Sequence, residues 1–145
     1  MSKAQQKADK DLVVGLGATG LSIARYLKRN DRNAIFYDSR KEPPGLDKLD
    51  ELIPDAELRL GNDKLPRNVT RVIASPGIPD SHPLLRKARK KKLEIVSDIE
   101  LFAREASKPF VAVTGSNGKS TVTTLLYHMC RADAVSYTHL RAHET

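Results

Sequence analysis

The sequence contains little that would cross-link the chain or anchor it to a membrane. It has one cysteine, Cys130, and no tryptophan. A single cysteine excludes an internal disulfide, which fits a reducing compartment. No apolar run approaches the ~20 residues that a membrane-spanning helix needs, and residues 1–11 lack the apolar centre of an export signal. We therefore expect a cytoplasmic protein without a membrane partner.

Aromatic residues are also scarce, and this bears on the basic character of the chain. The 145 residues carry a net charge of +7, which favours anionic partners such as nucleotides or nucleic acid. The densest basic run is RKARKKK at residues 86–92, and no aromatic residue interrupts it. We interpret this run as a solvated helix face rather than a nucleic-acid-binding patch, and we expect no nucleic-acid partner.

The segment TGSNGKST at residues 114–121 has the composition of a phosphate-binding loop. It follows an apolar run at 110–113, which predicts a strand, and precedes a predicted helix at 122–129. Glycines allow the backbone to turn its N–H groups toward one concavity at a helix N-terminus. Val113 stands where a full Walker A pattern has its first glycine, so the loop is a shorter variant.

Three side chains of this loop have the chemistry that a nucleoside triphosphate requires. Lys119 can reach the terminal phosphates as a point charge. The hydroxyl of Ser120 or Thr121 can ligate Mg²⁺. The loop therefore predicts ATP and Mg²⁺ as ligands.

Strand and helix patterns alternate along the rest of the chain. The predicted strands are 12–14, 34–37, 57–60, 71–74 and 94–96, and the predicted helices are 19–28, 46–53, 83–91 and 98–106. This alternation is typical of an α/β fold with a parallel, Rossmann-like sheet and right-handed crossovers.

The same pattern predicts how the chain divides. We expect residues 1–96 to form a Rossmann-like substrate domain and 97–133 to form a linker helix and the start of a second, ATP-binding α/β domain. Residues 134–145 show no helix or strand period, so we expect a truncated chain with a non-native or disordered tail. His139 and His143 in this tail have the spacing of a metal pair, but no carboxylate accompanies them, and we expect no ligand role.

A second nucleotide signal lies near the start of the chain. GLGATG at residues 15–20 matches the G-x-G-x-x-G turn of dinucleotide-binding folds, and Asp38 ends the next strand about 18 residues beyond Gly20. A tight turn without a ligand and a turn-capping aspartate are the alternatives. Arg40 is either a phosphate or uracil contact or a surface arginine, and Gly77 either lines a ligand cleft or belongs to an ordinary turn.

The presence of both signals narrows the class of function. A dehydrogenase needs only the first turn, and a simple NTPase needs only the second. An enzyme that holds a nucleotide-linked substrate and also hydrolyses ATP needs both. An NAD(P)-dependent oxidoreductase domain is the alternative, and it leaves residues 114–121 unexplained.

Motifs along most of the chain resemble, in order, those of the Mur ligase family. They are at residues 15–22, 43–49, 74–78, 97–102 and 113–121, and the resemblance covers about 12–131. It implies an ADP-forming ligase of peptidoglycan synthesis with three domains. The implied reaction joins D-glutamate to UDP-N-acetylmuramoyl-L-alanine through an acyl phosphate, with ATP and Mg²⁺.

The resemblance also implies the roles of individual residues. Ala18 and Thr19 would contact the diphosphate, Asp38, Ser39 and Arg40 would hold the uridine, and Gly77 would line the same cleft. The ATP site would comprise Gly115, Ser116, Asn117, Gly118, Lys119, Ser120 and Thr121, with Ser120 and Thr121 as the candidate Mg²⁺ ligands. Lys119 would be catalytic by stabilising the transferring phosphoryl group. The D-glutamate site would lie beyond this chain, which we therefore expect to be inactive alone.

Overall fold

A computed structural model describes residues 10–108 and 110–132 of the chain. The predicted tail at 134–145, with His139 and His143, lies outside these residues. The chain forms two compact units, of which the first ends at Glu105 and the second begins at Ala106. No helix within the described residues is both long enough and apolar enough to cross a bilayer.

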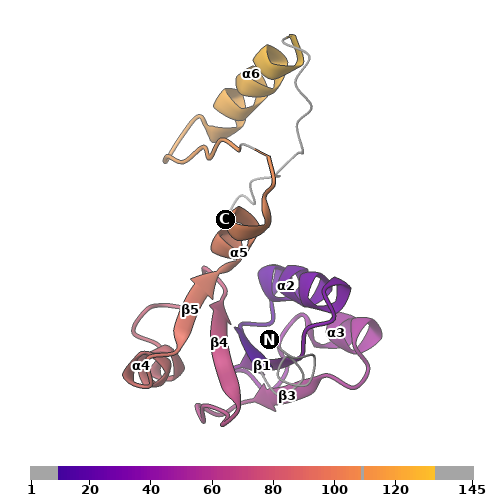
Figure 1. The fold of residues 1–145 in the computed structure, drawn as a ribbon, viewed down its shortest axis with the longest axis vertical. Helices are drawn as coiled ribbons and strands as arrows, with labels where there is room; N and C mark the ends of the chain where they lie inside the picture. Colours follow the sequence, from indigo (N-terminus) through magenta and orange to yellow (C-terminus); the bar gives the residue numbers. More distant parts are fainter. Residues whose placement is uncertain (1–9, 109, 133–145) are drawn as a thin grey trace. The chain divides into compact units, whose positions relative to one another are not determined.

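The first unit is built on a five-stranded parallel sheet with the order β3-β2-β1-β4-β5 (Figure 1). Its strands are β1 (Lys10–Val14), β2 (Ala34–Asp38), β3 (Glu57–Leu60), β4 (Val69–Ala74) and β5 (Glu94–Ser97). The predicted Rossmann-like α/β fold is confirmed. The chain moves outward from β1 to β2 and β3 and then returns to β4 on the other side of β1. The carboxyl ends of β1 and β4 therefore mark the topological switch point of the sheet.

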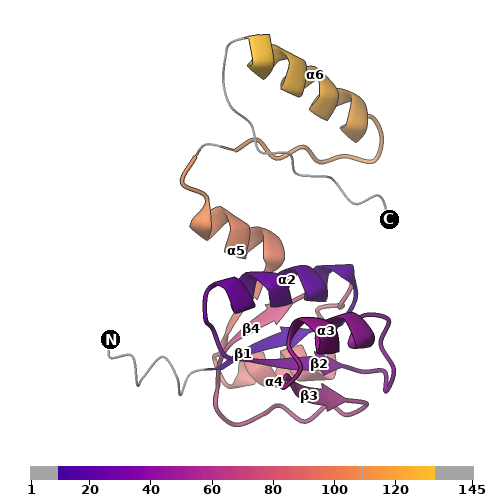
Figure 2. The same ribbon diagram turned by 90° about the vertical axis from the view of Figure 1, so that its right-hand side faces the viewer.

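Helices cover both faces of this sheet (Figure 2). They are α2 (Ala18–Arg29), α3 (Leu46–Leu52), α4 (Pro83–Lys90) and α5 (Asp98–Glu105). Leu21, Leu49 and Leu101 bring α2, α3 and α5 into the core on one face. The other face packs against α4 through its buried residues Leu84, Leu85 and Ala88.

Successive residues of the central strand alternate between these two cores. Val13 belongs to the core under α2, whereas Leu12 and Val14 belong to the core under α4, and all three are fully buried. A strand buried on both faces reads as a continuous apolar run. This is why the short sequence at 12–14 was sufficient to predict a strand there.

The second unit contains α6 (Lys119–Ala132), which follows the glycine-rich segment. The helix predicted at 122–129 is confirmed and begins earlier, at Lys119. The strand predicted at 110–113 is wrong, because the structure assigns no strand there. A strand gains its hydrogen bonds from a neighbouring strand, and the described residues of this unit include no other strand to pair with it.

Candidate functional site

Turns that follow three strands meet at the carboxyl edge of the sheet. The Gly15 amide donates to the Tyr37 carbonyl of β2 at 2.8 Å, and the Ser75 amide donates to the Val14 carbonyl of β1 at 3.0 Å. The Ser75 hydroxyl lies 3.4 Å from the Gly15 carbonyl oxygen. These bonds join the turn after β1 to the end of β2, and the turn after β4 to β1 and its turn. They lie at the switch point, where open α/β sheets bind their ligands.

The three glycines of the first turn have different structural roles. Gly15 has φ +101°, a conformation that a side chain disfavours. A Cβ on Gly20 would lie only 2.0 Å from the Gly15 carbonyl oxygen, so Gly20 permits α2 to pack closely on the turn. A Cβ on Gly17 would have no neighbour within 4 Å. The backbone at Gly17 is therefore open to an approaching group.

The start of α2 supplies the donors that an anion at this opening would need. Gly17 is the N-cap of the helix and has no side chain to bond the first amides. The N–H groups of a first helical turn have no intrahelical acceptor, and the helix dipole adds partial positive charge there. Ala18 is exposed and Thr19 half-buried, so both predicted diphosphate contacts lie at an accessible helix end.

Asp38 is buried behind this turn, with 3% of its surface exposed. Its Oδ2 accepts the Leu16 amide at 2.9 Å, and the Arg40 guanidinium donates to both carboxylate oxygens at 2.9 and 2.8 Å. The Arg40 side chain, with help from the Leu16 and Arg40 amides, lowers the pKa of Asp38 to about 2, against the opposing effect of burial. Asp38 is therefore an anion at neutral pH.

The contacts of Asp38 support one of the alternatives that the sequence left open. The Arg40 amide donates to Asp38 Oδ1 at 2.9 Å across two residues, which is the geometry of a turn-capping aspartate. Arg40 pairs with Asp38, although its side chain is 55% exposed, and Ser39 beside it is exposed. The structure thus brings Asp38, Ser39 and Arg40 to the edge of the site.

The turn after β4 lies beside a hollow of about 660 Å³. Ser75 and Ile78 line this hollow together with Ser97 and Glu100 from the end of β5 and the start of α5. Gly77 is exposed, and a Cβ on it would have no neighbour within 4 Å. The backbone at Gly77 is therefore accessible, but Gly77 is not among the residues that line this hollow.

The second unit presents a separate glycine-rich loop at the N-terminus of α6. Gly115 and Gly118 have φ values of +145° and +78°, and a Cβ on Gly118 would meet no neighbour within 4 Å. The Lys119 ammonium bends back over the loop and donates to the Gly115 carbonyl at 2.7 Å. The loop therefore combines an open backbone with a cation at its mouth, which fits a phosphate group.

The remaining residues of this loop are also accessible. The structure exposes four of them, Ser116, Asn117, Ser120 and Thr121. The hydroxyls predicted to ligate Mg²⁺ are therefore accessible on the first turn of α6. Within the described residues, no group of three or more His, Cys, Asp or Glu could hold a metal ion.

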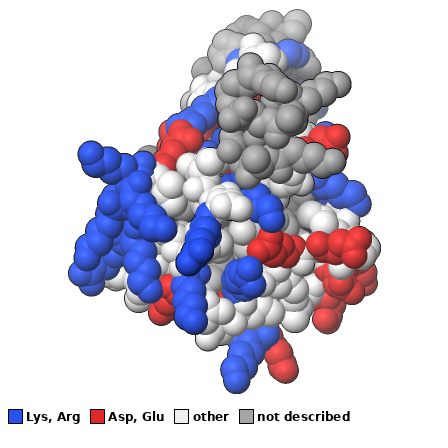
Figure 3. Space-filling view, turned by 60° about the horizontal axis from the view of Figure 1, so that its bottom comes forward, with Lys and Arg blue, Asp and Glu red and all other residues white. Residues whose placement is uncertain are grey.

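The basic run lies on the outer surface of α4 and just beyond it. Arg86, Lys87, Lys90, Lys91 and Lys92 are exposed, whereas the apolar residues of α4 are buried against the sheet. Figure 3 shows the densest group of Lys and Arg at the left of the view, with other basic and acidic residues spread over the rest of this face. The geometry is that of the solvated helix face predicted from the sequence.

Sequence reasoning gave Leu16 no role of its own and placed Gly45 only within the family motif at 43–49. The Gly45 amide donates to the Leu16 carbonyl at 3.0 Å. A Cβ on Gly45 would lie 2.7 Å from that carbonyl oxygen. The glycine after Pro43 and Pro44 was the available signal, because a glycine beside a nucleotide turn often marks close backbone approach.

Comparisons with known proteins were made for this chain. The family model described as "Mur ligase MurD-like, N-terminal domain" matches residues 9–97. The UDP-N-acetylmuramoylalanine–D-glutamate ligase of Legionella pneumophila (strain Paris) is 50% identical over 123 residues, which are 83% of this chain and 28% of the relative. The proteins of the same name from Nitrosococcus oceani and Shigella sonnei are each 46% identical, over 87% and 86% of this chain and 28% of their own length. The chain thus spans about 28% of the length of these relatives.

Proposed function

The chain belongs to the Mur ligase MurD-like N-terminal domain family, and from this premise we propose that it is the nucleotide-substrate part of an ATP-dependent ligase. The reaction would join D-glutamate to UDP-N-acetylmuramoyl-L-alanine during peptidoglycan synthesis in the cytoplasm. The names of the relatives from Legionella pneumophila and Nitrosococcus oceani support this assignment.

The observation that carries the proposal is the open turn at Gly17 at the switch point of the sheet. The UDP diphosphate would lie against Gly17 and accept the amides of Ala18 and Thr19, where the helix end supplies donors and positive potential. The uridine would extend toward the turn after β2, where it would meet Ser39 and Arg40, and Gly77 would line the same cleft.

ATP and Mg²⁺ would be held by the loop at 115–121 of the second unit. The open backbone at Gly118 and the Lys119 ammonium 2.7 Å from the Gly115 carbonyl support this role. Lys119 would leave that carbonyl and bind phosphate oxygens, and the hydroxyl of Ser120 or Thr121 would ligate the metal. ATP supplies the phosphoryl group that activates the substrate carboxylate. Lys119 would stabilise the negative charge that develops on the transferring phosphoryl group.

We further propose that residues 1–96 form the UDP-substrate domain and that 97–133 lead into the ATP-binding domain. The D-glutamate site would belong to parts of the full-length enzyme that this chain does not contain. The chain alone would then bind nucleotides without forming the amide. Incubation with UDP-N-acetylmuramoyl-L-alanine, D-glutamate and ATP, followed by chromatography of the nucleotide-sugar, would test this, since any glutamylated product would contradict it.

Titration of the chain with UDP and with NADH tests the central assignment. Tighter binding of UDP is expected, because the turn at Gly17 would serve a UDP-linked substrate. Tighter binding of NADH would instead support the alternative, a nicotinamide-dependent oxidoreductase domain. A Gly17→Ala variant is the matched control, since binding at this turn should weaken when a methyl group fills it.

A further inference from the structure

We propose that Asp38 is a positioning residue for the diphosphate, acting through the Leu16 amide, and does not itself contact the nucleoside. This inference rests on the proposed function, because it concerns how the same turn recognises UDP. It differs from the role expected from the resemblance, in which Asp38 holds the uridine.

The carboxylate of Asp38 is already occupied by groups of the chain. Oδ1 accepts the amide and Nε of Arg40, each at 2.9 Å. Oδ2 accepts the Leu16 amide at 2.9 Å and Nη2 of Arg40 at 2.8 Å. Each oxygen thus has two donors, which is about its full capacity. With Asp38 only 3% exposed, a ribose or uracil group would have to displace a buried bond to reach it.

The bond from Leu16 connects Asp38 to the surface that would meet the diphosphate. Leu16 lies directly before Gly17, and its side chain is fully buried. Its amide is held by Asp38 from the end of β2, and its carbonyl accepts the Gly45 amide at 3.0 Å. The amide and the carbonyl of Leu16 are therefore both held by hydrogen bonds, one to Asp38 at the end of β2 and the other to Gly45 before α3. The direction of the following amides at Gly17 and Ala18 depends on this clamp.

A negative charge suits this clamp better than a neutral amide does. A carboxylate accepts bonds only, so both of its oxygens can serve Leu16 and Arg40 at the same time. An asparagine would turn an NH₂ group toward one of these donors and lose at least one bond. Hydrogen bonds to a charged group are stronger than those between neutral groups, so loss of the clamp would leave the turn free to change shape.

The inference predicts which part of UDP loses affinity when the clamp is removed. For Asp38→Asn, UDP binding should weaken roughly tenfold, in line with the loss of one charged hydrogen bond. Uridine binding should weaken clearly less than UDP binding, because Asp38 reaches the nucleoside only through Arg40. Calorimetry measures the affinity for UDP, and ligand-observed NMR measures the weaker affinity for uridine. Asp47→Asn is the matched control, since it removes an exposed carboxylate of the same unit and should change neither value.

A second measurement reports on the clamp without any ligand. Amide hydrogen exchange at Leu16 should be at least tenfold faster in Asp38→Asn, with exchange at Val13 in β1 unchanged. If Asp38→Asn does not fold, Asp38→Glu takes its place. Glutamate keeps the charge but moves the carboxylate by one methylene away from the Leu16 amide, so the same expectations hold.

The outcomes separate this inference from the proposed function. Equal losses for UDP and uridine would show that Asp38 acts mainly on the nucleoside, directly or through Arg40, and unchanged UDP binding would show that the clamp is unimportant; either result overturns the inference alone. A wild-type chain that binds no UDP would instead overturn the proposed function and, with it, the inference. A larger loss for UDP than for uridine, together with faster exchange at Leu16, would establish the inference.

Discussion

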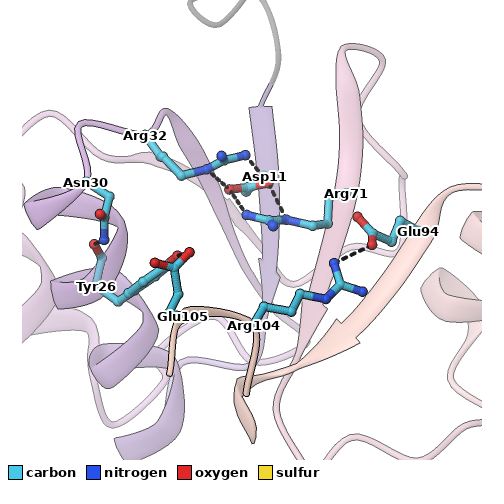
Figure 4. A network of polar contacts seen from close by, with 8 residues as sticks. All are labelled: Asp11, Tyr26, Asn30, Arg32, Arg71, Glu94, Arg104 and Glu105. Atoms are coloured by element: carbon cyan, nitrogen blue, oxygen red, sulfur yellow. Dashed lines mark hydrogen bonds and ion pairs between the residues drawn. The ribbon is translucent and has the colours of Figure 1, made fainter. Parts of the chain in front are cut away.

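Asp11 and Arg71 form a bidentate ion pair at the amino-terminal end of the sheet. Arg71 Nε lies 3.0 Å from Asp11 Oδ1, and Arg71 Nη2 lies 2.9 Å from Asp11 Oδ2. Asp11 lies on β1 and Arg71 on the neighbouring strand β4. Arg32, from the segment before β2, donates to the same carboxylate at 2.9 Å (Figure 4). The Asp11 side chain is completely buried. This cluster therefore ties three segments of the first unit together at the edge opposite the candidate site.

Replacing Asp11 by asparagine should strongly destabilise the first unit. The substitution leaves the Arg71 guanidinium, which is only 15% exposed, without its counter-charge. Breaking such a pair costs about 3–5 kcal/mol, mainly through the charge left behind. Urea unfolding followed by circular dichroism should show this loss.

The matched control is Arg104→Gln on α5. Arg104 pairs with Glu94 and Glu100, but all three side chains are more than 40% exposed. Exposed pairs contribute about 0–1 kcal/mol, so this variant should unfold close to the wild type. A similar loss for both variants would show that burial of the Asp11 pair is unimportant.

Gly20→Ala should impair folding, whereas Gly17→Ala should leave folding nearly unchanged and weaken UDP binding. Gly20→Ala places a Cβ 2.0 Å from the Gly15 carbonyl oxygen, so it should lower the unfolding free energy or prevent folding. Gly17→Ala meets no neighbour and needs no unusual φ. It should unfold within about 1 kcal/mol of the wild type yet bind UDP at least tenfold more weakly. Thermal unfolding and calorimetry of both variants make this comparison, and normal UDP binding by Gly17→Ala would place the diphosphate elsewhere.

Stability should fall in acid partly because of Asp38. The pKa of Asp38 is lowered from 3.8 to about 2 in the folded chain. A lowered pKa stabilises the fold above the unfolded value, and this contribution is lost as the pH falls from about 4 to about 2. It amounts to roughly 2 kcal/mol. Urea unfolding at pH 5, 4, 3 and 2 should show a steeper loss for the wild type than for Asp38→Asn, and parallel curves would contradict the pKa shift.

The sequence predicted most of the first unit because its signals are local. The apolar runs of β1 and β2 and the glycine turn between β1 and α2 each determine structure within a few residues. Parallel pairing then follows from the alternation of strands and helices. The prediction of a strand at 110–113 was wrong, because a strand forms only beside partner strands, which no local pattern supplies.

The candidate site was predictable in position but not in its internal bonds. Gly17 and Asp38 were assigned from motif spacing and Ala18 from the family resemblance, and all three lie at the carboxyl edge of the sheet. The bonds from Asp38 and Gly45 to Leu16 were missed, because they join loops that are distant in sequence. Only the three-dimensional arrangement shows that Asp38 faces the protein and that its oxygens are occupied.

Lys119→Ala should remove ATP binding without affecting UDP binding. Lys119 is the cation at the mouth of the loop, where it now contacts only the Gly115 carbonyl. Its removal should weaken ATP binding at least tenfold, since charge-assisted bonds to phosphate are lost. Fluorescence titration with a labelled ATP analogue measures this effect. Lys108→Ala is the control, and an equal loss in that variant would indicate attraction by overall charge.

Random DNA should bind weakly, because the basic surface of α4 has no aromatic residue for stacking. Arg86, Lys90 and Lys91 carry charge, but no aromatic ring accompanies them on which an unpaired base could stack. Binding at physiological salt should be weaker than micromolar and should disappear as salt rises. Fluorescence anisotropy with a labelled single-stranded oligonucleotide of random sequence measures this binding. Micromolar or tighter binding would overturn the interpretation of this surface as a solvated helix face.

The apolar surface of α6 should make the chain self-associate at high concentration. Val122, Leu125 and Met129 are 46%, 60% and 57% exposed, and their spacing places them on one side of the helix. Exposed apolar patches of this kind promote association. Light scattering should therefore show a mass that rises with concentration, and Leu125→Lys should reduce the rise. Thr124→Lys adds the same charge at an exposed polar position, so it separates the loss of apolar surface from the gain of charge. A clean monomer of the wild type at high concentration would contradict the prediction, as would equal effects of the two variants.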